Sequence, residues 1–120
     1  RLGEKATLVS WIVSDVLDFI PDTSYDIWHD RAAFHFLASK SQIDTYISLT
    51  QKFVSRNLII GAFSDNGPLK CSGLEITQYS KNKMSEAFNA GFQPIKCIRE
   101  THQTPFKTTQ DFVFCSFKKR

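Results

Sequence analysis

Short apolar segments rich in β-branched and aromatic residues alternate along this chain with segments of helical periodicity. The expected strands are the nearly continuous apolar runs at 8–16 and 57–63, the short segment at 25–28, and the β-rich stretches at 92–100 and 111–117. A helical turn is expected at 32–37, one helix after a cap at Ser39 or Ser41, and a second from Ser80 to Gly91. Strands separated by helices need crossover connections, so the pattern predicts an α/β fold with a mostly parallel sheet and helices on both faces. The last two strands follow one another directly, which predicts an antiparallel final strand.

The chain has the size and composition of a single domain. It contains 120 residues, 42% of them hydrophobic and 22% charged, without a linker or repeat that would divide it. No apolar run approaches the roughly 18 to 20 residues needed to cross a bilayer, so we expect no membrane partner. The net charge of +3 is small and dispersed, so we expect no nucleic-acid partner.

The cysteine count bears on the compartment. Cys71, Cys97 and Cys115 are three in number and include no C-x-x-C pair, which argues against a disulfide framework and against a four-thiolate zinc site. Cys97 and Cys115 fall on the last two strands and are expected in the core. A reducing cytoplasm is therefore the expected location.

The first residues indicate that the domain starts upstream. The segment RLGEKA resembles the end of a helix, with basic residues around Gly3 just before an apolar run, and the only methionine is the internal Met84. We therefore expect a piece of a longer domain.

Four strings in order along the chain carry a family resemblance. They are VSWIVSDVLDF, YDIWHDRAAFHFL, NLIIGAFSDNGPLKCSGLEITQYS and HQTPFKTTQDFVFCSFKK. Together with the helix–strand–strand ending, they resemble the later blocks of small class I S-adenosylmethionine-dependent methyltransferases. The resemblance extends over essentially all 120 residues, and HDRAAFHF and GPLKCSGLEITQYS are its most specific parts. It implies a Rossmann-like fold with S-adenosylmethionine as the cofactor.

The chain departs from that family at the start of the fold. Such enzymes open with a strand, a G-x-G turn, a helix, and a strand ending in an acidic residue that binds the ribose, which is the physics of dinucleotide sites. The glycines here lie at positions 3, 61, 67, 73 and 91, too far apart to form that turn. The resemblance therefore implies a truncated fold, from the third strand onward.

The resemblance assigns cofactor contacts to the end of the first expected strand. Asp15 would accept a hydrogen bond from the adenine amine, and Val16 would pack nearby or donate its backbone nitrogen. The structural alternative for Asp15 is a solvated strand-end carboxylate or a helix cap. Position favours the site reading because open α/β sheets bind ligands at the carboxyl ends of their strands.

The triplet His29, Asp30 and Arg31 is expected to follow the second strand at the same end of the sheet. The resemblance places this block beside the methionine part of the cofactor and the methyl acceptor, so these residues are the candidate catalytic groups and His29 is also a candidate cofactor contact. His29 could serve as a general base, or it could be an orienting or structural histidine. For Asp30 and Arg31 the alternative is a surface ion pair of little energy.

The substrate side of the expected site lies near the third strand. Phe34 could frame the pocket, although such rings are more often simply core. Ser64, Asn66 and Gly67 belong to the loop that closes the substrate side in the family. His35 and His102 lack ligand partners at metal spacing, so no metal is expected.

Two functional interpretations follow from the resemblance. In the first, the chain is the carboxyl-terminal portion of a methyltransferase acting on a small-molecule or protein nucleophile. In the second, it is a truncated, non-enzymatic binding or interaction domain; an unrelated α/β binding protein is a third alternative. In the family the two missing strands lie between the first strand here and the strand at 25–28, so their absence exposes two strand edges. We therefore expect gap closure, a homodimer through strand edges, or aggregation.

Overall fold

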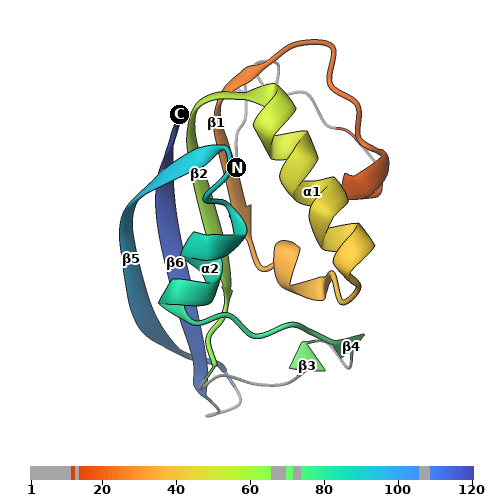
Figure 1. Ribbon diagram of the computed structural model, residues 1–120. Helices are drawn as coiled ribbons and strands as arrows, with labels where there is room; N and C mark the ends of the chain where they lie inside the picture. The colour runs from red at the N-terminus through yellow and green to blue at the C-terminus, as the bar shows by residue number, and fades with distance from the viewer. Residues whose placement is uncertain (1–11, 13, 66–69, 72–73, 106–108) are drawn as a thin grey trace, which may run out of the picture.

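A four-stranded sheet with helices packed against it forms the body of the protein (Figure 1). The computed structural model describes residues 12, 14–65, 70–71, 74–105 and 109–120. The helical elements are the 3-10 turns η2 (Val16–Asp18) and η3 (Phe34–Phe36) and the helices α1 (Lys40–Phe53) and α2 (Lys81–Ala87). The strands are β1 (Tyr25–Arg31), β2 (Val54–Phe63), β3 (Lys70–Cys71), β4 (Leu74–Glu75), β5 (Phe92–Gln103) and β6 (Thr109–Lys119).

The described sheet is mixed rather than mostly parallel. Its strand order is β1-β2-β6-β5, and β3 pairs separately with β4. β1 and β2 are parallel, whereas β6 is antiparallel to both β2 and β5. The crossover from β1 through α1 to β2 accounts for the parallel pair, because a helix between two strands returns the chain to the end of the sheet at which the first strand began. The expected antiparallel last strand is confirmed, and it lies inside the sheet rather than at its edge.

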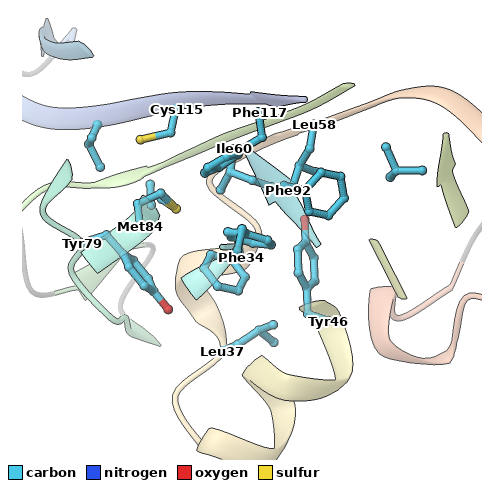
Figure 2. Close-up of a cluster of buried hydrophobic side chains, with 14 residues drawn as sticks. Phe34, Leu37, Tyr46, Leu58, Ile60, Tyr79, Met84, Phe92, Cys115 and Phe117 are labelled. Carbon is cyan, nitrogen blue, oxygen red and sulfur yellow. The ribbon is translucent and has the colours of Figure 1, made fainter. Parts of the chain in front are cut away.

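The described helices cover one face of the sheet (Figure 1). A single core fills the space between, and Figure 2 shows Tyr46 rising from α1 with its hydroxyl directed at the strands. The fully buried members of this core are Phe34, Tyr46, Leu58, Ile60, Ala62, Met84, Phe88, Phe92, Val113, Cys115 and Phe117. The second layer of helices expected on the opposite face is not among the described residues. That opposite face carries apolar side chains, of which Ile27 and Ile98 are 60% and 41% exposed.

The helix caps expected from the sequence are confirmed. Ser39 caps α1 in a reciprocal capping box with Gln42, and the Ser80 hydroxyl accepts a hydrogen bond from the backbone of Lys83 at the start of α2. The expected turn at 32–37 appears as η3. α2 ends at Ala87, earlier than the expected stop at Gly91.

The expected strand bounds need correction at two places. Most of the first expected strand, 8–16, lies outside the described residues, and its described end is different: Asp15 caps η2, which begins at Val16. The second strand does not end at Trp28 but continues to Arg31, because β2 offers parallel partners up to Gly61. The polar triplet at 29–31 is therefore part of the strand rather than a loop after it.

A disulfide corrects the expectation drawn from the cysteine count. Cys97 of β5 and Cys115 of β6 lie directly opposite one another in the antiparallel register, with their Cα atoms 4.1 Å apart, and their sulfur atoms are bonded. The register brings them together although they are 18 residues apart in sequence. The argument for a reducing cytoplasm rested partly on the absence of such a bond and loses that support.

Candidate functional site

A cavity of about 390 Å³ lies along β1, between this strand and η2. It has the size of a small-molecule pocket, which is typically about 300 to 1,000 Å³. Its lining residues are Val16, Phe19, Ile27, Trp28, His29, Asp30, Arg31, Ala33 and Tyr46. The three candidate catalytic residues and two of the three candidate cofactor contacts, Val16 and again His29, therefore share one cavity.

The Asp30 carboxylate is the best-connected group in this cavity. One oxygen accepts a hydrogen bond from the backbone of Ala33 at 2.8 Å, and the other accepts one from the backbone of Phe34 at 3.0 Å. The Tyr46 hydroxyl of α1 donates a further, short hydrogen bond to the second oxygen. The indole nitrogen of Trp28 donates in turn to the Tyr46 hydroxyl at 3.0 Å. The side chains of Trp28, Tyr46 and Asp30 thus form a hydrogen-bonded network that links β1 to α1.

Burial has the largest effect on the protonation of Asp30 and Tyr46 in this network. It raises the pKa of Asp30 above its usual 3.8, although the Tyr46 hydroxyl and the two backbone donors act in the opposite direction. The pKa of Tyr46 is also raised, first by burial and then by the neighbouring Asp30 charge. At neutral pH the hydroxyl therefore remains protonated, which is the form that can donate to a carboxylate.

Asp30 also fixes the backbone turn that ends β1. The residue inside this turn, Ala32, has a φ of 67°, in the left-handed region that side chains disfavour. Its amide donates to the carbonyl of Gly61 at 2.8 Å, and the two Asp30 bonds hold the next two amides. The buried Asp30 carboxylate therefore holds a strained turn in place by accepting hydrogen bonds from its amides. Because Tyr46 also donates to it, the carboxylate has little hydrogen-bonding capacity left for a ligand.

His29 and Arg31 point to the opposite face of the sheet from Asp30. Side chains alternate along a strand, and in β1 Asp30 is buried while both of its neighbours are exposed. The Arg31 guanidinium lies over the rings of Phe112 and Phe114, 5.7 Å from each centroid. The structure therefore brings the triplet to one cavity but divides it between two faces, so Asp30 and Arg31 do not form the surface ion pair considered from the sequence.

Of the two predicted adenine contacts, only Val16 reaches the cavity. Val16 lines it and is half-buried. Asp15 is exposed, is not among the lining residues, and accepts a hydrogen bond from the backbone of Leu17 at 3.0 Å. The capping alternative for Asp15 is the arrangement found, and its role toward a cofactor stays a prediction.

The predicted substrate-side residues do not join this cavity. Phe34 is fully buried and packs its ring against those of Tyr46, Tyr79 and Phe88. Ser64 is buried at the end of β2 and donates to Asp111 of β6.

Ser64 lines a second cavity, of about 350 Å³, together with Tyr79, Lys81 and Arg99. Asn66 and Gly67 lie outside the described residues. The substrate-side assignment therefore stays a prediction.

Tyr46 and Trp28 are site residues that the sequence reasoning missed. Tyr46 occupies an apolar position of an amphipathic helix and Trp28 ends the expected strand YDIW, and neither pattern indicates a polar contact. Only the packing of α1 against β1 shows that the Tyr46 hydroxyl meets Asp30 and that the Trp28 indole nitrogen meets the Tyr46 hydroxyl.

The buried His35 is a second histidine with a defined environment. Its Nδ1 accepts a hydrogen bond from the backbone of Phe63 at 3.1 Å, and burial lowers its pKa to about 4. The ring is therefore neutral at physiological pH, with its proton on Nε2. Among the described residues neither Nε2 nor the hydroxyl of Tyr79 has a hydrogen-bond partner.

The described residues contain neither a metal-ligand cluster nor a membrane-spanning helix. They contain no group of three or more His, Cys, Asp or Glu side chains arranged to hold a metal ion. No helix in the described part of the chain is long and apolar enough to span a bilayer.

Comparison with solved structures identifies the fold. An N-methyltransferase, NodS from Bradyrhizobium japonicum WM9, in complex with S-adenosyl-L-homocysteine, matches with a TM-score of 0.71 and 15% identity over 97% of this chain and 58% of the other. The 1,6-didemethyltoxoflavin-N1-methyltransferase of Burkholderia thailandensis matches with a TM-score of 0.65 and 14% identity, over 87% of this chain and 48% of the other. The magnesium protoporphyrin IX methyltransferase of Synechocystis PCC 6803 matches with a TM-score of 0.65 and 13% identity, over 98% and 52%. No family model and no curated protein matches the sequence.

These structural similarities establish the fold and show how much of each methyltransferase the chain covers. The chain has the Rossmann-like fold found in part of these methyltransferases, and it spans about half of their length. Sequence identities of 13 to 15% carry no assignment of substrate to this chain.

Proposed function

We propose that this chain is the carboxyl-terminal portion of an S-adenosylmethionine-dependent methyltransferase and that the cavity along β1 is its part of the cofactor site. The observation that carries the proposal is the position of the cavity, beside the carboxyl end of a parallel strand in a methyltransferase fold. Open α/β sheets bind their ligands at this end of the strands. Two of the solved structures described above contain S-adenosylhomocysteine.

The cavity suits part of such a cofactor. The side chains of Val16, Phe19 and Trp28 supply an apolar wall of the kind that packs against a purine ring. No acidic side chain other than the fully engaged Asp30 lines the cavity, so the described residues provide no ribose ligand there. The chain therefore offers one wall of the site, in line with the absent glycine-rich turn.

Methyl transfer from S-adenosylmethionine requires few catalytic groups from the protein. The bound cofactor supplies a methyl group already activated by the positive charge on sulfur, and the protein aligns the acceptor and removes its proton. Asp30, held by Tyr46, would fix the turn at the end of β1, and the exposed His29 would accept the proton. The acceptor is a small-molecule or protein nucleophile whose proton leaves as the new bond to the methyl group forms.

The second candidate function is a non-enzymatic binding domain of methyltransferase fold. The observation that favours it is Asp15, which is engaged as a cap and does not reach the cavity. Association with a second copy of the chain through a strand edge belongs to both functions.

Calorimetric titration with S-adenosylhomocysteine separates the two candidates. Val16→Asp places a charge in the apolar wall of the cavity, and we expect it to abolish binding. Ile95→Asp is the matched control, because Ile95 is 58% exposed on β5 and lies outside the cavity. Binding that is lost only in Val16→Asp supports the cofactor site. No binding by the unmodified chain, even after an upstream segment with the strand, G-x-G turn and helix is supplied, refutes it and leaves the binding-domain function.

A further inference from the structure

The Cys97–Cys115 disulfide joins two strands that are held in the sheet to different degrees. β6 pairs with β2 on one side and with β5 on the other, whereas β5 lies at the edge of the described sheet (Figure 1). The register of β5 with β6 also shifts between Pro94 and Lys96, just before Cys97. A movement at the disulfide is therefore taken up more easily by β5 than by β6.

The two sulfur atoms also differ in their access to solvent. Cys115 is fully buried in the core, whereas Cys97 is half-buried and packs against that core from outside. The hydroxyl of Ser85 in α2 lies 3.5 Å from the Cys97 sulfur, and it is the donor because a disulfide sulfur carries no proton. Cys97 is therefore the sulfur that a thiol from solvent can attack. The Ser85 hydroxyl can stabilise the Cys97 thiolate that forms on reduction.

The residue pair next to the disulfide on the same face of the sheet is Arg99 and Val113. Side chains two residues apart share a face of a strand, and the register places Arg99 opposite Val113. Both line the second cavity, of about 350 Å³, at the carboxyl end of β2. The Arg99 guanidinium donates there to the Asp111 carboxylate and to the Ser64 hydroxyl. The disulfide thus lies beside residues that shape this cavity.

Reduction of the disulfide pushes β5 and β6 apart at this position. Without the covalent bond the two sulfur atoms return to van der Waals contact, at which they are farther apart than in a disulfide. Cys115 has no room to recede, because a close-packed core and two neighbouring strands surround it. The half-buried Cys97 and its edge strand therefore move instead, and Arg99 moves with them.

We propose that the disulfide is a reversible redox switch: a thiol reductant opens it, β5 moves outward, and Arg99 loses its contacts with Asp111 and Ser64. The oxidised form keeps the second cavity in the shape described above. The reduced form alters the wall of the cavity that Arg99 supplies. The switch involves neither the cavity along β1 nor a bound cofactor, so it stands or fails separately from the proposed function.

The reductant is a small dithiol, and the exchange balances in two steps. One thiolate of the dithiol attacks the Cys97 sulfur and forms a mixed disulfide, while the bond to Cys115 breaks and the Cys115 sulfur leaves as a thiolate that takes up a proton. The second thiolate then attacks the sulfur of the dithiol in the mixed disulfide and releases Cys97 as a thiolate, which is protonated in turn. Two electrons and two protons pass to the protein, and the dithiol becomes a cyclic disulfide.

Treatment of the 120-residue chain with dithiothreitol, followed by alkylation and mass spectrometry, tests the chemistry. We expect Cys97 and Cys115 to become alkylated together without denaturant, and the bond to form again in oxidised dithiothreitol. A cooperative melt of the reduced chain shows that it stays folded. Brief treatment with glutathione, a monothiol, should stop at the first step and leave the mixed disulfide on Cys97.

Nuclear magnetic resonance of the backbone amides and of the Arg99 side chain tests the effect on the second cavity. We expect reduction to shift the resonances of Arg99, Ser64 and Asp111 and to speed amide exchange in β5 roughly tenfold or more. The amides of β1 should not change, because β2 and β6 separate this strand from the disulfide.

The matched control is the double variant Cys97→Ala, Cys115→Ala, which retains Cys71 but cannot form the bond. It should show the resonances of the reduced form without any reductant, and dithiothreitol should leave its spectrum unchanged. If the double variant does not fold, Cys97→Ser serves the same purpose, because it prevents the bond and leaves the buried Cys115 in place.

Four outcomes would overturn the proposal. A disulfide that opens only in denaturant is a purely structural link. Reduction that unfolds the whole chain would show that the bond holds the fold together and does not switch it. A mixed disulfide on Cys115 would contradict the order of attack. Reduction that leaves the Arg99 and Ser64 resonances in place would show that the bond does not control the second cavity.

Discussion

Removing the hydroxyl of Tyr46 measures how much the hydrogen bonds among Trp28, Tyr46 and Asp30 contribute to the free energy of unfolding. The substitution Tyr46→Phe keeps the ring, which packs in the core, and deletes one donor to Asp30 and one acceptor for Trp28. A hydrogen bond to a charged group contributes about 1.5 to 3 kcal/mol, and a neutral one about 1 kcal/mol. Trp28 is only half-buried and can turn to water, so we expect a loss of about 2 to 3 kcal/mol in the free energy of unfolding at pH 7.

The pH dependence of this loss identifies Asp30 as the partner. The pKa of Asp30 in the folded state is raised above 3.8. Its contribution to the free energy of unfolding therefore falls as the pH rises from about 3.8 through the folded-state pKa, and it is constant at higher pH. The Tyr46 hydroxyl opposes that fall by stabilising the carboxylate. Its removal should therefore cost most at neutral pH and roughly 1 kcal/mol less once Asp30 is protonated, where only a neutral hydrogen bond is lost.

Urea unfolding followed by far-ultraviolet circular dichroism over a pH series from 7 down to 3 measures both quantities. Tyr79→Phe is the matched control, because Tyr79 is also buried but its hydroxyl has no hydrogen-bond partner among the described residues. That control should be neutral or slightly stabilising. Equal losses for the two variants, or a loss from Tyr46→Phe that does not change with pH, would refute the assignment of Asp30 as a carboxylate held by Tyr46.

Three further substitutions probe the turn after β1, the sheet face and the disulfide. Ala32→Gly relieves a left-handed residue and should raise the free energy of unfolding by about 0.5 to 1 kcal/mol after the extra backbone entropy of glycine; a lower urea midpoint would contradict this. Gly61→Ala would place a Cβ 2.4 Å from the ring of Phe114, so we expect a loss of about 1 to 3 kcal/mol, and an unchanged midpoint would show that the ring moves aside easily. Replacing Cys97 and Cys115 by alanine removes a link across 18 residues and should cost about 3 kcal/mol, and a reductant should lower the midpoint of the unmodified chain but not that of the double variant.

The order and type of the main elements could be predicted because each depends on local pattern. The apolar run at 57–63 became the inner part of β2, and the serines at 39 and 80 cap the two helices where the sequence indicated. Strand ends were less predictable. His29, Asp30 and Arg31 are polar and suggest a loop, yet pairing with β2 keeps them in β1.

The site was only partly predictable because its contacts join distant segments. Asp30 was selected for its position after an apolar run, but its hydroxyl partner comes from a helix 16 residues later. A tyrosine at an apolar helix position gives no indication of a polar role until the strand opposite is known. The disulfide escaped prediction for the same reason, because the cross-strand register, and not cysteine spacing, sets which two sulfur atoms meet.

The place of β6 in the sheet has a consequence for synthesis on the ribosome. β6 is the last strand in the chain order, yet it lies between β2 and β5 and provides the pairing partner of both. Until residues 109–119 have emerged from the exit tunnel, β5 has no neighbour in the described sheet and β2 is paired only with β1. A nascent chain at that stage exposes two strand edges, so it is the stage at which chaperone binding would protect it most.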